Sequence, residues 1–209
     1  MTAPNIPKSP RIILASRSKA RQDMLRSAGV EFETMPADIN EETLQQSGAE
    51  PAKVAQQLAE QKALLIAKQN PDALVIGSDQ VLEFEGQLVS KPANPDDAIT
   101  QLKAMAGKQH RLMSAVALAQ GDSIVWTAQD SATLTMHALD DAFFEAYKAR
   151  AGGALTRSVG GYWFEDIGSW LFEAIEGDYF TILGMPLLPL LKELRTQHSV
   201  EWAQGKWTM

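Results

Sequence analysis

A serine-rich turn near the start of the chain has the composition of a phosphate-binding site. Ser16, Ser18 and Arg21 stand between a short apolar run and a helical pattern that closes at Gly29. The N-terminus of a helix presents free backbone amides, so hydroxyl groups and cations placed there are suited to hold phosphate oxygens. The same serines are also suited to cap the helix, a role that uses the same amides.

A carboxylate and an amine further along the chain are candidates for acid–base and charge-stabilising chemistry. Asp79 follows residues 73–76, the clearest buried strand, and ligands of open α/β sheets collect at the carboxyl ends of strands. The alternative is an ordinary aspartate in a turn. Lys62 falls on the apolar stripe of a helix expected over residues 51–69. An amine there either covers apolar surface or points into a cleft.

The elements that must position these residues alternate between strand and helix patterns, which indicates an α/β fold. We expect one unit over residues 11–196, with tails at 1–10 and 197–209. Glu85 and Gly86 predict a hairpin turn between residues 81–84 and 87–90. Other strands are expected at 12–15, 30–35, 73–76, 112–119, 123–127 and 132–136, an acidic loop at 38–42, and helices leading into Gly29 and over 51–69, 94–107, 139–150 and 187–195.

Composition narrows the classes of function. A net charge of -7 and a pI near 5.0 argue against a polynucleotide partner, which requires a broad cationic face. A small anion would instead need a local group of lysines and arginines, together with a divalent cation. The absence of cysteine excludes disulfides, thiolate metal sites and a cysteine nucleophile, and the three histidines match no metal spacing. Without an export signal or a membrane span, we expect a cytoplasmic location and no membrane partner.

Five short motifs resemble, in the same order, those of the Maf family of nucleotide pyrophosphatases. The likeness spans residues 11–195. It implies a mixed twisted sheet flanked by helices, with two lobes around a central cleft as in inosine triphosphatase-like proteins. It also implies hydrolysis of a nucleoside triphosphate to a monophosphate and pyrophosphate, and a homodimer. The matching segments are 14–21, 60–63, 76–80, 90–92, and 177–179 with 183–187.

The resemblance also assigns roles to individual positions. Asp79 matches the proposed general base, and Glu41 and Asp79 are expected to hold Mg²⁺ or Mn²⁺ through oxygen ligands. Glu41 stands in an acidic run, for which a solvated loop is the alternative. The expected catalytic residues are Glu41, Lys62, Asp79 and Lys91, and the expected substrate-binding residues are Ser16, Ser18, Arg21, Gln80 and Glu165.

Gln80 and Glu165 decide the substrate subclass. Family members similar to dTTP and UTP pyrophosphatases carry Thr and Gln at these positions, whereas 7-methyl-GTP pyrophosphatases carry Gln and Glu, as this chain does. A carboxylate accepts from guanine N–H groups and favours a cationic methylated purine. The alternatives are a dTTP or UTP pyrophosphatase and a nucleotide-binding regulator of cell division without catalysis.

The sequence departs from the family pattern at three positions, Lys19, Ala20 and Asp166. The first two bear on the geometry of the serine-rich turn and on base choice. Asp166 replaces a glycine and is an alternative carboxylate for base recognition. Tyr162 and Trp163 are candidates for a stacking face, or else for core packing.

Overall fold

The computed structural model describes residues 10–46 and 48–197, so most of both expected tails lies outside the described residues. The elements, in chain order, are β1 (Arg11–Leu14), α1 (Lys19–Ser27), β2 (Glu33–Thr34), α2 (Glu41–Gln45), α3 (Pro51–Gln69), β3 (Ala73–Phe84), β4 (Gln87–Val89), α4 (Pro95–Met105), β5 (Gln109–Gln120), β6 (Ser123–Met136), α5 (Asp141–Ala151), α6 (Ala154–Arg157), η1 (Ile167–Leu171), β7 (Phe172–Glu176), α7 (Tyr179–Ile182) and α8 (Leu187–Gln197).

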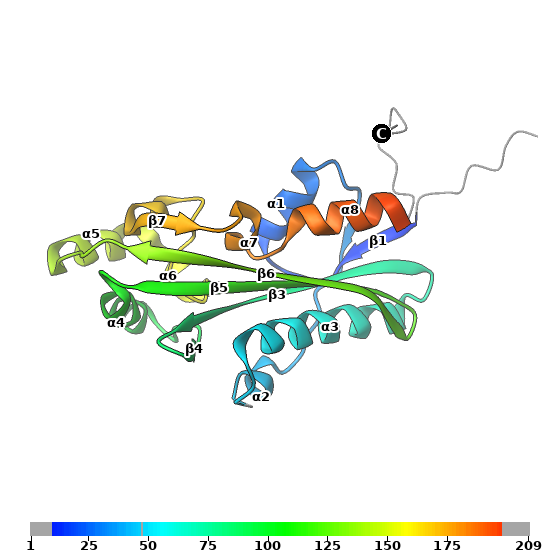
Figure 1. Ribbon diagram of the computed structural model, residues 1–209, viewed down its shortest axis with the longest axis horizontal. Coiled ribbons are helices and arrows are strands. Elements are labelled where there is room, and N and C mark those ends of the chain that lie inside the picture. Colours follow the sequence, from blue (N-terminus) through cyan, green and yellow to red (C-terminus); the bar gives the residue numbers. More distant parts are fainter. Residues whose placement is uncertain (1–9, 47, 198–209) are drawn as a thin grey trace, which may run out of the picture.

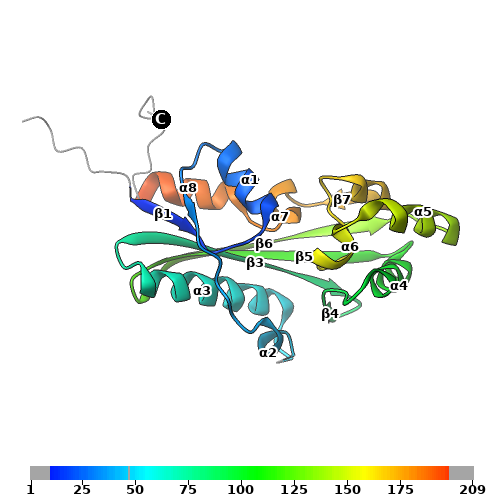
Figure 2. The same ribbon diagram turned by 180° about the vertical axis from the view of Figure 1, so that it is seen from behind.

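A mixed seven-stranded sheet forms the centre of the fold, in the order β2-β1-β3-β5-β6-β7 with β4 paired to β3. β1 runs parallel to β2 and β3, and the remaining pairs are antiparallel. The helix α3 covers one face of the sheet, whereas α1, α7 and α8 lie on the other (Figure 1). The reverse view shows the same two layers (Figure 2). The predicted α/β class with a mixed sheet flanked by helices is therefore confirmed.

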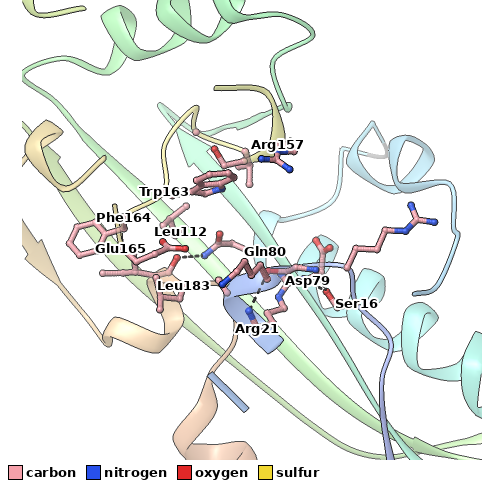
Figure 3. Close-up of a pocket in the computed structure, with 18 of the residues that line it drawn as sticks. Ser16, Arg21, Asp79, Gln80, Leu112, Arg157, Trp163, Phe164, Glu165 and Leu183 are labelled. Carbon is pink, nitrogen blue, oxygen red and sulfur yellow. Dashed lines mark hydrogen bonds between the residues drawn. The ribbon is translucent and has the colours of Figure 1, made fainter. Parts of the chain in front are cut away.

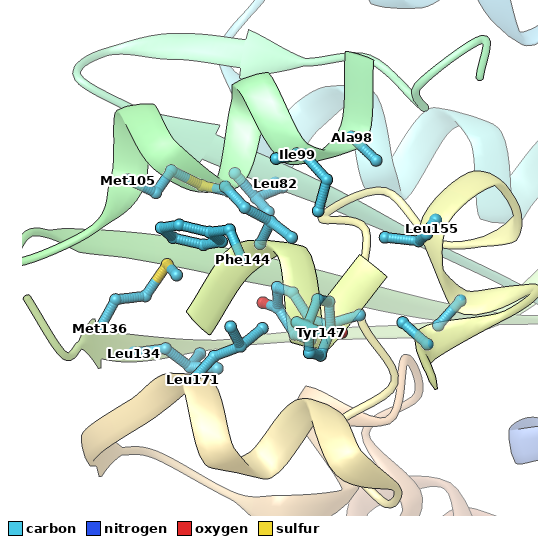
Figure 4. Close-up of a cluster of buried hydrophobic side chains, with 14 of the residues drawn as sticks. Leu82, Ala98, Ile99, Met105, Leu134, Met136, Phe144, Tyr147, Leu155 and Leu171 are labelled. Carbon is cyan, nitrogen blue, oxygen red and sulfur yellow. The ribbon is translucent and has the colours of Figure 1, made fainter. Parts of the chain in front are cut away.

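Three apolar clusters fix the layers and create two lobes. One cluster packs α3 against β1, β3 and β5, and a second packs α1 and α8 against the opposite face of the same strands. The third lies at the far end of the sheet, where Phe144 and Tyr147 of α5 meet Leu82 and Leu134 (Figure 4). The third cluster is joined to the other two by the long strands and by α7, which contributes Ile182 to the third and Phe180 to the second, so the sheet bridges two lobes.

Several expected elements form for local reasons. Pro51 occupies the first turn of α3, where a proline removes no helical hydrogen bond. Asn94 caps α4 by accepting from the backbone N–H of Asp97 at 2.9 Å. Glu85 and Gly86 both adopt positive φ, at 51° and 80°, as a two-residue hairpin between β3 and β4 requires.

Other predicted segments were wrong in their bounds. The predicted acidic loop at residues 38–42 instead contains the start of α2, because Asn40 caps it by accepting from the backbone N–H of Glu42. Residues 123–127 and 132–136 belong to the single long strand β6, which pairs with β5 from Ser123 to Thr135 with one register shift. The strand predicted at 30–35 is limited to Glu33–Thr34. No helix among the described residues has the length and apolar character to cross a bilayer.

Candidate active site

The site lies at a gap in the edge of β3. β5 occupies one edge of this strand along its length, while the other edge pairs with β1 as far as Ile76 and with β4 only from Leu82 onward. Among residues 10–46 and 48–197, the intervening stretch, which contains Asp79, therefore has no strand neighbour on that side. Asp79 had been expected just beyond a short strand, but β3 continues through it because β5 pairs with residues 75–83. The carboxylate thus sits on a rigid strand.

Side chains of β3 alternate between the two faces of the sheet, so Asp79 faces α3 and Gln80 faces α7. On the α3 side, Lys62 Nζ lies 2.5 Å from Asp79 Oδ1 and 2.6 Å from Glu41 Oε1. Lys62 and Asp79 are only 8% and 5% exposed. Three side chains from α2, α3 and β3 therefore form one cluster of charges, in which Lys62 and Asp79 are buried and Glu41 is half-buried.

The close approach of α3 to β3 depends on Gly77. An ideal Cβ at this position would lie 2.2 Å from the carbonyl oxygen of Ala59 and 2.6 Å from the backbone nitrogen of Ala63. No side chain fits there without moving backbone. The glycine therefore allows the helix to bring Lys62 over Asp79, two residues further along the strand.

The two carboxylates of the cluster differ in acidity. Burial raises the pKa of Asp79, and the nearby Glu41 adds to this effect, against the opposing influence of Lys62 and Arg21. Burial also disfavours ionisation of Glu41, but Lys62, Lys91 and Arg21 together outweigh it and lower the Glu41 pKa. Asp79 is consequently suited to accept a proton, and Glu41 to remain an anion.

The serine-rich turn and this cluster line the same pocket, of about 820 Å³, in which Ser16, Arg21 and Asp79 lie on one side (Figure 3). Ser18 caps α1, accepting from the Arg21 backbone N–H at 3.4 Å. The Arg21 side chain donates from Nε to the carbonyl of Gly184 at 2.8 Å and from Nη1 to Ser16 Oγ at 3.3 Å. Burial lowers the Arg21 pKa, while Asp79 and Glu41 act in the opposite sense. Arg21 is thus held by neutral acceptors and contacts no carboxylate of the residues that the structure describes.

Gln80 lies on the floor of the pocket with its amide orientation fixed. Its Nε2 lies 2.9 Å from the Thr181 carbonyl oxygen, 3.0 Å from that of Ile182 and 3.1 Å from Ser114 Oγ. These three acceptors occupy both N–H groups. The amide oxygen is therefore the part of Gln80 left for a ligand, and it acts as an acceptor only.

Aromatic and acidic residues of the segment 160–166 form a further wall of the same pocket. Trp163, Phe164 and Glu165 line it, and the Glu165 carboxylate is exposed. Asp166 also lines the pocket, but its side chain caps η1 by accepting from the backbone N–H of Ile167 at 2.8 Å. Of the two candidate carboxylates, Glu165 is thus the one without a structural hydrogen bond among the described residues.

Comparison with known proteins identifies the chain. A model of the Maf family, described as "Maf-like protein", matches residues 11–197. The chain belongs to the Maf family. It is similar to a protein of Rhodopseudomonas palustris named nucleoside triphosphate pyrophosphatase, at 45% identity over 89% of this chain and 93% of that protein.

Two further similarities were found. A Brucella abortus protein named 7-methyl-GTP pyrophosphatase is 44% identical over 91% of this chain and 98% of its own length. Among solved structures, a HAM1 protein from Coxiella burnetii matches 62% of this chain and 74% of its own with a TM-score of 0.44 and 17% identity.

All nine site residues expected from the Maf resemblance line this one pocket. They come from the loop after β1, the helices α1, α2 and α3, the strand β3, the segment after β4 and the segment before η1. Tyr162, by contrast, is 6% exposed with its hydroxyl 2.7 Å from His110 Nε2, so it packs mainly in the core. The nine residues are Ser16, Ser18, Arg21, Glu41, Lys62, Asp79, Gln80, Lys91 and Glu165.

The structure adds one residue to the Maf pocket, and one that supports its wall, which the sequence did not reveal. Arg157 lines it from α6, an element that no pattern predicted. Gln101 of α4 donates to the carbonyl of Ser90 at 3.2 Å and so anchors the segment that carries Lys91. Neither residue belongs to a Maf motif, and a lone arginine or glutamine carries no signal in a sequence.

Glu41 and Asp79 are the pocket residues suited to a hard divalent cation. Among the described residues, no group of three or more histidines, cysteines, aspartates or glutamates could hold a metal ion. The two carboxylates nevertheless lie close together, because one oxygen of each contacts the same Lys62 nitrogen. One or two carboxylates completed by substrate phosphates are a usual ligand set for Mg²⁺. The donor set therefore fits such an ion once a triphosphate is bound.

Proposed function

We propose that this protein cleaves 7-methyl-GTP between its α and β phosphorus atoms, releasing 7-methyl-GMP and pyrophosphate. We also propose that residues 11–196 form one domain. The observation that carries the proposal is the position of the Lys62–Asp79–Glu41 cluster together with the turn of Ser16 and Arg21 in one pocket. This member of the Maf family is an enzyme, a nucleoside triphosphate pyrophosphatase.

The chemistry requires charge neutralisation, an aligned water molecule and a stabilised leaving group. The water oxygen attacks the α-phosphorus while Asp79 accepts a proton from it, a role that the raised Asp79 pKa favours. The bond to the bridging oxygen breaks, and pyrophosphate leaves with the electron pair. Arg21, Lys62 and Lys91 stabilise the negative charge that develops.

A divalent cation, Mg²⁺ or Mn²⁺, would be held by Glu41 and Asp79 together with phosphate oxygens. When bound, it supplies charge neutralisation to the triphosphate. The lowered pKa of Glu41 keeps this ligand ionised. Lys62 holds one oxygen of each carboxylate in place and leaves the second oxygen of each for other partners.

Recognition of the base is assigned to Glu165 and Gln80. The fixed amide oxygen of Gln80 and the Glu165 carboxylate are both acceptors, and guanine presents N–H donors. The cationic ring of 7-methylguanine adds a favourable interaction with the carboxylate. The same two groups offer a pyrimidine fewer matching contacts.

Release of pyrophosphate from 7-methyl-GTP, GTP, dTTP and UTP tests the proposal. We expect the highest kcat/KM with 7-methyl-GTP, and loss of turnover when the divalent cation is removed with a chelator. An equal or higher kcat/KM with dTTP would refute the choice of substrate. Tight nucleotide binding without any release of pyrophosphate would instead favour a regulatory protein.

A further inference from the structure

Arg157 is a pocket residue with no charged partner. Its side chain makes no salt bridge or hydrogen bond with the described residues, although it lines the pocket and is exposed. Of the other cations that line it, Lys19 pairs with Asp23 and Lys62 with two carboxylates, whereas Arg17, Arg21 and Lys91, like Arg157, form no salt bridge with the described residues. In a chain of net charge -7, an unpaired arginine at a pocket indicates an anionic ligand.

The guanidinium of Arg157 is nevertheless held in place. Its Cζ lies 5.1 Å from the centroid of the Trp163 ring, and it also packs closely against Gly153. An ideal Cβ at Gly153 would lie 2.2 Å from Arg157 Nη2 and 2.6 Å from its Nε. Contact with an aromatic ring leaves the in-plane N–H donors free, and these match phosphate oxygens bidentately.

Arg157 approaches the pocket from the wall opposite the serine-rich turn. Figure 3 shows Arg157 and Trp163 on one side, Ser16 and Arg21 on the other, and Gln80 between them. A ligand lying over Gln80 thus meets cationic side chains from both walls. We infer that Arg157 is a substrate-binding residue that contacts the polyphosphate chain from the α6 side and complements Arg21 and Lys91.

Removing the charge of Arg157 tests this inference, which rests on the proposed function. Arg157→Gln is expected to raise KM roughly tenfold for every nucleoside triphosphate, since one charge-assisted contact is lost. The ratio of kcat/KM for 7-methyl-GTP to that for GTP should stay unchanged. Arg150→Gln is the matched control, because Arg150 is an exposed arginine of α5 outside the pocket.

A second variant displaces the guanidinium without deleting it. Gly153 has φ -68° and ψ -15°, so alanine is compatible with the backbone there, and the new methyl group meets only the flexible end of Arg157. Gly153→Ala is expected to raise KM less than Arg157→Gln does. The double variant should match Arg157→Gln, because the two changes act through one group.

Binding of inorganic tripolyphosphate, measured by calorimetry with Mg²⁺ present, separates this inference from the proposed function. Weaker binding by Arg157→Gln, with Arg150→Gln unchanged, supports a polyphosphate contact even if the wild-type protein fails to hydrolyse 7-methyl-GTP. Tripolyphosphate affinity within twofold of wild type overturns the inference. A changed ratio between bases with unchanged tripolyphosphate affinity also overturns it, because the contact would then be with the base.

Discussion

Lys62 Nζ lies 2.5 Å from Asp79 Oδ1, inside the layer between α3 and β3. The same nitrogen contacts Glu41 at 2.6 Å, so one buried cation serves two carboxylates. If the cation is removed, the buried Asp79 carboxylate is left beside the half-buried Glu41 without a compensating charge. The cluster is therefore both the chemical centre of the pocket and a strong constraint on stability.

Lys62→Met is expected to lower the free energy of unfolding at neutral pH by about 3 kcal/mol or more, because it leaves buried charges uncompensated. The loss should shrink at acid pH, where the carboxylates become protonated. Urea unfolding across pH measures both effects. Lys68→Met, an exposed position on the same helix, is the control and should change little. A Lys62 variant as stable as the control would contradict the prediction.

Asp79→Asn is expected to lower kcat by a hundredfold or more, since an amide cannot accept the proton of the attacking water. The fold should persist, because asparagine has nearly the same shape. Pyrophosphate release and circular dichroism measure the two outcomes. Asp122→Asn, in the exposed turn between β5 and β6, should retain full activity. Activity retained by the Asp79 variant would remove this residue from the role of base.

The raised pKa of Asp79 predicts a pH dependence of stability. The folded protein holds this proton more tightly than the unfolded chain. The resulting stabilisation is full below the ordinary aspartate pKa and is lost as the pH rises through the raised value. The unfolding free energy of Asp79→Asn, relative to wild type, should therefore increase over that window. If the difference in unfolding free energy between the two proteins did not change with pH, it would be inconsistent with a raised Asp79 pKa.

The same pKa also governs turnover. The base must be unprotonated, so kcat/KM should fall on the acid side with an inflection above the ordinary aspartate pKa. Glu41, with its lowered pKa, remains ionised over that range. Measuring kcat/KM against pH checks this expectation. An acid limb at or below the ordinary value would argue that Asp79 is not the titrating group.

Glu165→Gln is expected to reduce the preference for 7-methyl-GTP over GTP several-fold, because it removes the negative charge facing the cationic base. Asp166→Asn should leave that ratio and the melting temperature nearly unchanged, since the asparagine side-chain oxygen can still cap η1. Parallel assays with both nucleotides measure the ratio. The reverse pattern would identify Asp166 as the base-recognising carboxylate.

Gly77→Ala is expected to destabilise the fold by roughly 3 kcal/mol, because its Cβ would clash with the backbone of Ala59. Gly153→Ala is the matched control, in which the new methyl group meets only a flexible side chain. Thermal unfolding of both variants measures the contrast. Equal melting temperatures would show that α3 can move away from β3.

The sequence by itself determined the features with a local cause. The helix α3 with Pro51 in its first turn, the hairpin at Glu85 and Gly86, and the Asn94 cap all follow from nearby residues. The order of the Maf motifs predicted nine site residues, all of which line one pocket. The position of Lys62 on an apolar stripe indicated that it would lie in a cleft or over apolar surface.

Only the tertiary structure decided how those residues meet. β3 extends through Asp79, and β6 is continuous, because neighbouring strands supply hydrogen bonds that no local pattern records. Contacts with Trp163 and Gly153 hold the Arg157 side chain at the pocket, and these contacts depend on the packing of α6. Such contacts join elements whose intrinsic helix or strand propensities are weak. The geometry of the contacts is therefore fixed by burial and by strand pairing across the whole chain.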